Sequence, residues 1–173
     1  KFIRIKGTTM EDEFEQLAQS IDSVRLTKIP DGRSVETLIE FNGRIKVDLS
    51  GIKQPILLGE LEYLAPHITN TSIQTDHFND SGYLSHYLIL ECVTISFSGP
   101  FEGYFDERDM HDFHMAILKL PKIKTVRFDT SKLNEEQTEQ LEVSFKSLGS
   151  EIQVEFFESR RKKKVLKRQL SVG

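Results

Sequence analysis

Residues 123–133 read Ile-Lys-Thr-Val-Arg-Phe-Asp-Thr-Ser-Lys-Leu, and the spacing of their apolar side chains decides the fold that we predict. Val126 and Phe128 alternate with polar residues, which is the pattern of a strand with one buried face. Ser131 follows where the chain must turn, and Leu133 returns to the core. The same pattern recurs at residues 3–10, at 45–52 and, more loosely, at 93–99. This repetition predicts a stack of strand–turn–helix units, an architecture that mainly binds other macromolecules.

A stretch with helical spacing of apolar residues follows each copy of the pattern. We therefore predict four helices, whose apolar stripes lie within residues 14–21, 57–68, 110–118 and 141–148. Thr8 or Thr9 can cap the first helix, and Thr130 or Ser131 can cap the last. Their side-chain oxygens would accept hydrogen bonds from the free N–H groups of the first turn.

The string at residues 123–133, h-x-x-h-x-h-x-x-Ser-x-h with h apolar, resembles the leucine-rich repeat, L-x-x-L-x-L-x-x-N-x-L. The resemblance implies a parallel sheet with helices on one side, and a polar side chain that bonds to backbone in the turn after each strand. Ser131 stands where that family usually has Asn or Cys, and Thr8, Ser50 and Ser98 hold the position in other copies. Expected strand centres near 4, 25, 46, 94, 127 and 154 leave one long gap, with room for a strand around Ile73 or Tyr87.

Two segments depart from a simple array. Residues 37–49 predict a β-hairpin, because Asn42-Gly43 joins two strand-like runs and both positions accept positive φ. Residues 69–86 are rich in Asn, Asp, Ser and Gly, and they predict a surface loop. The predicted fold is therefore α/β, an irregular leucine-rich-repeat-like strand–helix array with a mainly parallel sheet and an inserted hairpin. A compact α+β domain with a mixed sheet is the alternative.

Charge divides the chain into a body and a tail. The net charge of its 173 residues is −4, yet seven of the 23 basic residues lie within 160–168, where no acidic residue occurs. Without them, 16 basic and 27 acidic residues remain, a net charge of −11. We predict one α/β repeat-like domain over residues 1–159 and a basic tail over 160–173. The cations of the tail are Arg160, Arg161, Lys162, Lys163, Lys164, Lys167 and Arg168.

The sequence offers no convincing catalytic or metal site. Cys92, the only cysteine, lies in an apolar stretch, where a free cysteine usually acts as a small hydrophobe. The acidic and histidine residues of 106–114 match a first helical turn better than a zinc site, because the usual companion motifs are missing. We therefore expect a non-catalytic protein without a cofactor. The lone cysteine and the lack of a signal peptide or a long apolar run predict an intracellular protein, cytoplasmic or nuclear, without a membrane span. Because the chain begins inside a strand pattern and without Met, we also expect it to be a fragment.

The outward positions of the predicted strands are the candidate binding residues. They are Arg4, Arg25, Lys46, Thr94, Arg127 and Glu155. Four of the six are basic, so we predict that this sheet face recognises an acidic protein partner. Degenerate repeats of this kind resemble the substrate-binding region of F-box adaptor proteins, which implies an adaptor role. The alternative is a nucleic-acid-binding module that uses the basic tail and the same stripe.

Overall fold

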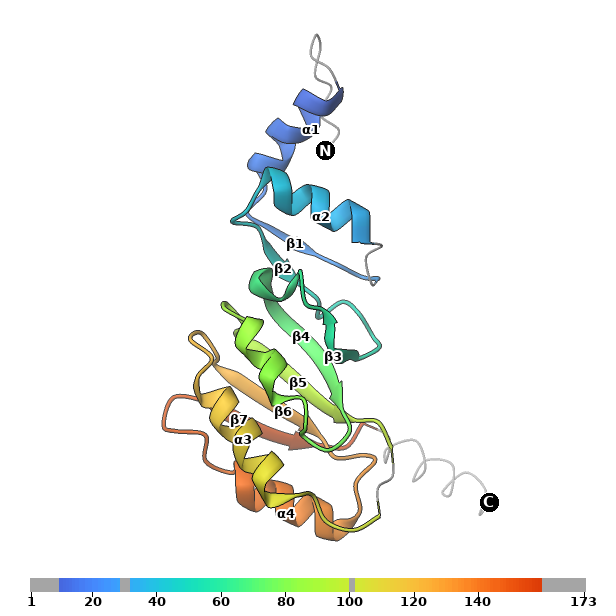
Figure 1. The fold of residues 1–173 in the computed structure, drawn as a ribbon, viewed down its shortest axis with the longest axis vertical. Coiled ribbons are helices and arrows are strands. Elements are labelled where there is room, and N and C mark those ends of the chain that lie inside the picture. The colour runs from blue at the N-terminus through green and yellow to red at the C-terminus, as the bar shows by residue number, and fades with distance from the viewer. Residues whose placement is uncertain (1–9, 29–31, 100–101, 160–173) are drawn as a thin grey trace, which may run out of the picture.

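The protein is an α/β structure built on one parallel sheet, as seen in a computed structural model that describes residues 10–28, 32–99 and 102–159 (Figure 1). Its strands are β1 (Ser23–Arg25), β2 (Lys46–Asp48), β3 (Ile56–Leu61), β4 (Ile68–Thr75), β5 (Cys92–Phe97), β6 (Thr125–Asp129) and β7 (Gln153–Phe157). Its α-helices are α1 (Met10–Gln19), α2 (Gly32–Phe41), α3 (Glu107–Leu118) and α4 (Glu135–Phe145), with short 3-10 helices η1 (Ala65–His67) and η2 (Ser81–His86).

The strands are stacked in the order in which the chain makes them. The sheet runs β1-β2-β4-β5-β6-β7, with every neighbouring pair parallel. Strand β3 also pairs with β4 in parallel, at Ile73 and Gln74, whereas β2 pairs at Ile68 and Asn70. Strands β2 and β3 therefore accompany successive parts of β4. The predicted α/β class and mainly parallel strand–helix array are confirmed.

One face of the sheet is buried and the other is open, because alternate residues of a strand point to opposite faces. The buried side forms rows across the strands. Val93 of β5 lies beside Val126 of β6, which lies beside Val154 of β7. The next inward row is Ile95, Phe128 and Phe156. Figure 1 shows α3 and α4 packed along the face of the sheet that these rows form.

A cluster of phenylalanine rings fills the space under α3 and α4. Phe78 lies at its centre, with ring centroids 5.3 Å from Phe97, 5.0 Å from Phe105 and 5.0 Å from Phe113. Its ring also stacks on Phe145, with 5.6 Å between centroids. All five rings are buried, and close aromatic pairs of this kind add about 0.5–1.5 kcal/mol each beyond the area that they bury. This cluster fixes the two helices against the sheet.

The two C-terminal helices form where their patterns predicted them, but α4 begins at another cap than the predicted one. Asp106 opens α3, and its side chain accepts hydrogen bonds from the backbone of Arg108 and Asp109. Helix α4 begins after a reciprocal capping box between Asn134 and Gln137, and not at Thr130 or Ser131. The chain first completes a turn after β6, in which Asp129 accepts a hydrogen bond from the backbone of Ser131.

The predicted hairpin at residues 37–49 is wrong. Most of its first arm lies in α2, and Leu38 and Ile39 pack against the core from that helix. Asn42 ends the helix instead of forming a hairpin turn. Its side-chain amide donates to the carbonyl oxygens of Ala18, at 2.8 Å, and Ile21, at 2.6 Å. Asn42 therefore makes a tertiary contact that joins the ends of α1 and α2, although the sequence predicted a hairpin turn at this residue.

The predicted helix over residues 57–68 is also wrong, because the chain continues there as strand β3, then η1. Gly59 has φ +102°, a backbone conformation that no α-helix contains and that L side chains rarely adopt. A Cβ added at Gly59 would meet the Tyr83 ring of η2 at 3.1 Å. The glycine thus admits both the backbone conformation and the close approach of the ring.

The predicted loop at residues 69–86 contains a central strand. Strand β4 has the alternation of a half-buried strand, but two of its inward residues are Thr71 and Thr75, each 1% exposed. Its outward residues are polar because they face the open side of the sheet. The further strand expected around Ile73 is therefore present.

Several expectations concern residues outside the described ranges, namely the strand of residues 3–5, Arg4 and the tail at 160–173. Within the ranges that are described, no helix is both long and apolar enough to cross a membrane.

Candidate functional site

The open face of the parallel sheet is the candidate functional site. Along each strand, the residues between the buried ones point to this face, and they are half-buried or exposed. Most are small or polar, unlike the aliphatic and aromatic rows beneath them. From β1 to β7 they are Ser23, Arg25, Lys46, Asp48, Asn70, Ser72, Gln74, Cys92, Thr94, Ser96, Thr125, Arg127, Asp129, Gln153, Glu155 and Phe157.

The strand register aligns these side chains in rows. Ser72, Thr94, Arg127 and Glu155 form one continuous row across β4, β5, β6 and β7. Neighbouring strands are about 4.8 Å apart, so the row is a regular ladder of polar groups. The structure therefore places the predicted Thr94 beside the predicted Arg127. Arg25 and Lys46 face the same side but lie at the other end of the sheet, on β1 and β2.

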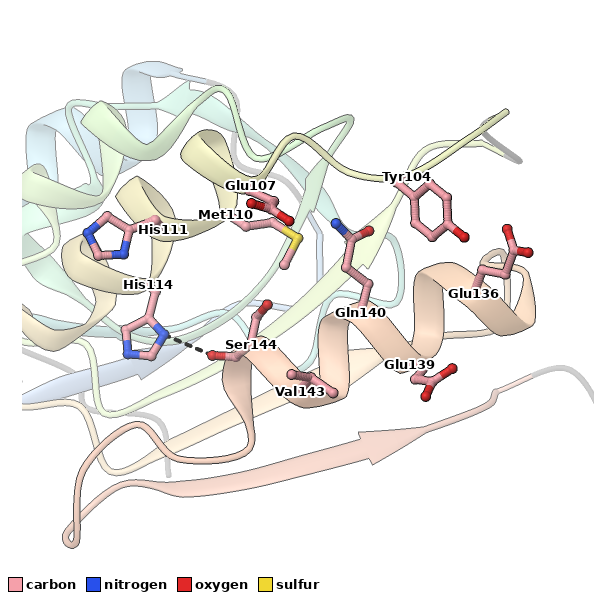
Figure 2. Close-up of a pocket in the computed structure, with 10 residues that line it drawn as sticks. All are labelled: Tyr104, Glu107, Met110, His111, His114, Glu136, Glu139, Gln140, Val143 and Ser144. Carbon is pink, nitrogen blue, oxygen red and sulfur yellow. Dashed lines mark hydrogen bonds between the residues drawn. The ribbon is translucent and has the colours of Figure 1, made fainter.

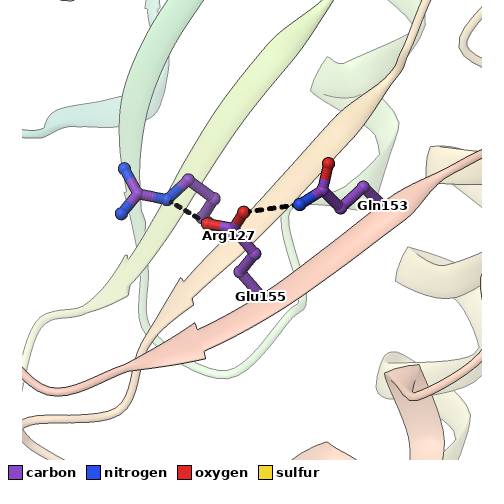
Figure 3. A network of polar contacts seen from close by, with 3 residues as sticks. All are labelled: Arg127, Gln153 and Glu155. Carbon is purple, nitrogen blue, oxygen red and sulfur yellow. Dashed lines mark hydrogen bonds and ion pairs between the residues drawn. The ribbon is translucent and has the colours of Figure 1, made fainter.

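Arg127 is held by its neighbours on β7. Its Nε atom donates to Glu155 at 2.9 Å, and Gln153 donates to the other oxygen of the same carboxylate at 2.8 Å (Figure 3). The guanidinium carbon also lies 4.7 Å from the centroid of the Phe157 ring. Arg127 is thus oriented by an ion pair and an aromatic face, and part of its charge is neutralised locally.

The open face is balanced in charge, whereas the sequence predicted a basic stripe. The described cations Arg25, Lys46 and Arg127 share the face with three carboxylates, those of Asp48, Asp129 and Glu155. The distribution is nevertheless uneven. Arg127 is paired with a carboxylate, while Arg25 and Lys46 form no ion pair with any residue of the described ranges. The available positive charge therefore lies at the β1–β2 end.

A polar hollow of about 270 Å³ lies at the carboxyl end of the strands, where the open face meets the loops. It is lined by Lys53 and Lys132 together with Gln74, Ser96 and Asp129, among others. Ligands of parallel sheets commonly bind at this end of the strands, where backbone and loop groups converge. The hollow extends the candidate site from the sheet into the turns that follow it.

Asp129 organises the rim of this hollow. Its carboxylate accepts hydrogen bonds from the Ser131 backbone at 3.0 Å and from the Ser159 hydroxyl at 2.8 Å. Burial alone would raise the pKa of Asp129, but the bonds from Ser131 and Ser159 outweigh burial and lower that pKa below its usual value. Asp129 is therefore a charged, fixed group at neutral pH.

In the turns after β2 and β6, an aspartate side chain bonds to the backbone, whereas the sequence predicted that a serine side chain would do so. Asp48 accepts a hydrogen bond from the Ser50 backbone at 2.8 Å, just as Asp129 does from Ser131. In both turns, the carboxylate two residues before the serine satisfies the backbone N–H group. Sequence reasoning missed these aspartates, although each lies at the same place in its copy of the repeated pattern.

Cys92 lies on the open face and is half-buried. Burial raises the pKa of its thiol, Arg127 lowers it, and Glu155 and Asp48 raise it further, so that the thiol is protonated at neutral pH. His86, a base that a reactive cysteine would need, is instead paired with Glu62, with 3.0 Å between Nε2 and Oε1.

Two of the acidic and histidine residues of 106–114 take structural roles. Asp106 caps α3, and His114 places its Nδ1 atom 3.0 Å from the carbonyl oxygen of Ser144. Across the described part of the chain, no group of three or more His, Cys, Asp or Glu side chains is arranged to hold a metal ion.

No protein-family model matches this chain, and no curated protein matches it either. The function is therefore inferred from the geometry of the open face.

Proposed function

We propose that this chain is a non-catalytic protein-recognition domain that binds a protein partner across the open face of its sheet. One observation carries the proposal: the polar residues of successive parallel strands form a broad ladder that no described helix covers. Stacked strand–helix arrays present such faces to macromolecules, and the leucine-rich-repeat-like pattern of residues 123–133 supports the same function. A role as an adaptor, with the partner as its cargo, follows by analogy.

The chemistry of the face supports a partner with an acidic group near β1 and β2. Arg25 and Lys46 are exposed and free of ion pairs with described residues, so an acidic side chain of a partner can pair with them. The β6–β7 end offers a preorganised Arg127 with its aromatic neighbour Phe157. Oriented Arg and aromatic groups are typical of the residues that dominate binding energy at interfaces.

The partner can be found and localised with a photo-reactive amino acid placed on the open face. We expect cross-linking through Thr94, at the centre of the polar row, and not through Lys119, which is exposed at the end of α3. The purified partner is then titrated against the quadruple variant Arg4→Ser, Arg25→Ser, Lys46→Ser and Arg127→Ser. The expected result is a loss of affinity of about tenfold or more.

A matched variant removes four cations away from the open face, by changing Arg108, Lys119, Lys122 and Lys146 to serine. The net charge changes equally in both variants, so equal losses of affinity would show that only the overall charge matters. Unchanged binding by the quadruple variant, with an unchanged melting temperature, would refute the proposal.

Nucleic-acid binding is the alternative function. Because the described open face carries as many acidic as basic side chains, the basic tail is the main support for this alternative. A phosphate-driven complex weakens steeply with salt, and its affinity would survive the open-face substitutions and fall when the tail is neutralised. Titration of a random single-stranded oligonucleotide at two salt concentrations separates the two functions.

A further inference from the structure

A groove of about 770 Å³ runs between α3 and α4, away from the open face of the sheet. Figure 2 shows Glu107, Met110 and His111 along one wall and Glu136 and Val143 among the residues of the other. Tyr104 stands at one end of the groove and the contact between His114 and Ser144 at the other (Figure 2). Helices α3 and α4 thus form the two walls of the groove.

The helices that form the groove are strongly acidic. Helix α4 carries Glu135, Glu136, Glu139 and Glu142 and no basic residue. Helix α3 carries three acidic residues and one basic residue, so the two helices together have a net charge of −6 with neutral histidines. None of these carboxylates forms an ion pair within the described ranges. Three of the seven carboxylates, Glu107, Glu136 and Glu139, line the groove, which therefore carries unneutralised negative charge.

The groove also exposes apolar surface. The side chain of Tyr104 is 67% exposed and that of Val143 is 76% exposed, and both line the groove. Met110, which is buried, belongs to the wall that α3 forms. A ligand that fits this surface carries several positive charges together with aliphatic side chains.

One segment of this chain has that composition. Residues 160–173 contain seven basic residues and no acidic one, with Val165 and Leu166 between basic residues and Leu170 after them. Their charge of +7 is opposite to the −6 of α3 and α4. The tail and the groove are therefore complementary in both charge and apolar character.

The tail starts at the carboxyl end of the sheet, at the rim of the hollow that Ser159 lines. Ser159, the last described residue before it, bonds to Asp129 and Ser131 in the turn that leads into α4. Fourteen extended residues span about 45 Å, whereas the 11 residues of α4 extend about 16 Å. The tail can therefore pass round this turn and follow the whole groove.

We propose that the basic tail, residues 160–173, docks in the acidic groove between α3 and α4 of the same chain. The tail cations face Glu107, Glu136 and Glu139, and its aliphatic side chains cover Tyr104 and Val143. Docking keeps the tail on the helical side of the molecule.

Trypsin tests this proposal on the full chain, because the enzyme cleaves after the lysine and arginine residues of the tail. The groove variant is Glu107→Gln, Glu136→Gln and Glu139→Gln. The control is Glu15→Gln, Glu36→Gln and Glu40→Gln, exposed carboxylates near α1 and α2 with the same change in charge. We expect the initial cleavage rate of the tail to rise at least about fivefold in the groove variant and to stay constant in the control.

Each other outcome overturns the proposal. Equal rates in the wild type and the groove variant mean that the groove does not hold the tail. Equal increases in both variants mean that the tail responds only to overall charge. If protection of the tail from trypsin increases with protein concentration, the groove binds the tail of a second copy of the chain. The variant Tyr104→Ser with Val143→Ser, which keeps every carboxylate, is expected to speed cleavage as well. Thermal unfolding confirms that each variant is folded.

Discussion

The sheet is backed in two different ways along its length. Between β5 and β7, two full α-helices return the chain from one strand to the next. Between β2 and β5, strand β3 and the short helices η1 and η2 do the same. The α-helical region is filled by large rings such as Phe113 and Phe145, whereas the short-helix region buries Leu64, just before η1, and Leu84 of η2, besides Phe78 between β4 and η2.

This difference shows that the strand is the constant part of the repeated strand–turn–helix unit. The row of Thr71, Val93 and Val126 continues in unbroken register from β4 to β6, across the boundary between the two regions, whereas the register shifts once between β2 and β4. The open polar face is therefore continuous even where the backing layer is not. A binding surface on that face can span the whole array.

The aromatic cluster should be the most sensitive part of the molecule. Phe145 is fully buried and contacts the rings of Phe78, Phe113 and Phe128. We expect Phe145→Ala to lower the free energy of unfolding by about 3–5 kcal/mol, and Leu64→Ala just before η1 by about 2–4 kcal/mol. Urea unfolding of both variants measures the difference. If Leu64→Ala were the costlier change, the two regions would not differ as described.

Two glycines, Gly43 and Gly51, test the region around β2, where the predicted hairpin is wrong. A Cβ added at Gly51 would lie 2.7 Å from the backbone oxygen of Leu26, so Gly51→Ala should destabilise the protein by about 1–3 kcal/mol. A Cβ added at Gly43 would meet no atom within 4 Å, and Gly43 has no positive φ, so Gly43→Ala should change stability by less than about 0.5 kcal/mol. Urea unfolding measures both changes. A large loss at Gly43 would instead support the hairpin turn.

Asp129 links the sheet to its carboxyl-end turns in the helix-backed region. Its loss leaves the Ser131 N–H and the Ser159 hydroxyl without their acceptor, so Asp129→Ala should cost about 1–2 kcal/mol at pH 7. Because the folded-state pKa of Asp129 is lowered, its contribution is present above the unfolded pKa and is lost as pH falls through the folded pKa. The gap between wild type and variant should therefore shrink below about pH 4. A gap that does not depend on pH would mean that the charge of Asp129 does not contribute.

The smallest effect is expected for the pair on the open face. Arg127 and Glu155 are each about two-fifths exposed, so their ion pair should contribute about 0.2–1 kcal/mol. A double-mutant cycle with Arg127→Ala and Glu155→Ala measures this coupling, which should fall when salt is raised. A coupling of several kcal/mol would mean that Arg127 serves mainly the fold and not recognition.

The regular C-terminal units were predictable because local and tertiary preferences agree there. Residues 107–118 and 135–145 have apolar stripes and good caps, and both segments are helical in the structure. In β4, inward Thr71 and Thr75 hid the strand, because polar residues at buried positions break the expected alternation. At Asn42, a contact with Ala18 and Ile21, more than 20 residues away, overrode a strong local turn signal.

The candidate site was predictable in its positions but not in its electrostatics. Arg25, Lys46, Thr94 and Arg127 lie on the open face because the period of a strand places every second residue there. The sequence could not show that Glu155 would pair with Arg127, because that contact depends on the register between β6 and β7.

The sequence by itself determined the repeated strand unit, the parallel class of the sheet and the residues that face outward, since these depend on periodicities of a few residues. The tertiary structure alone decided which connections between neighbouring strands are helices and which are turns. It also decided where charge is neutralised on the open face and where α3 and α4 leave an acidic groove. Those features depend on contacts between residues far apart in the chain, and local preferences do not encode them.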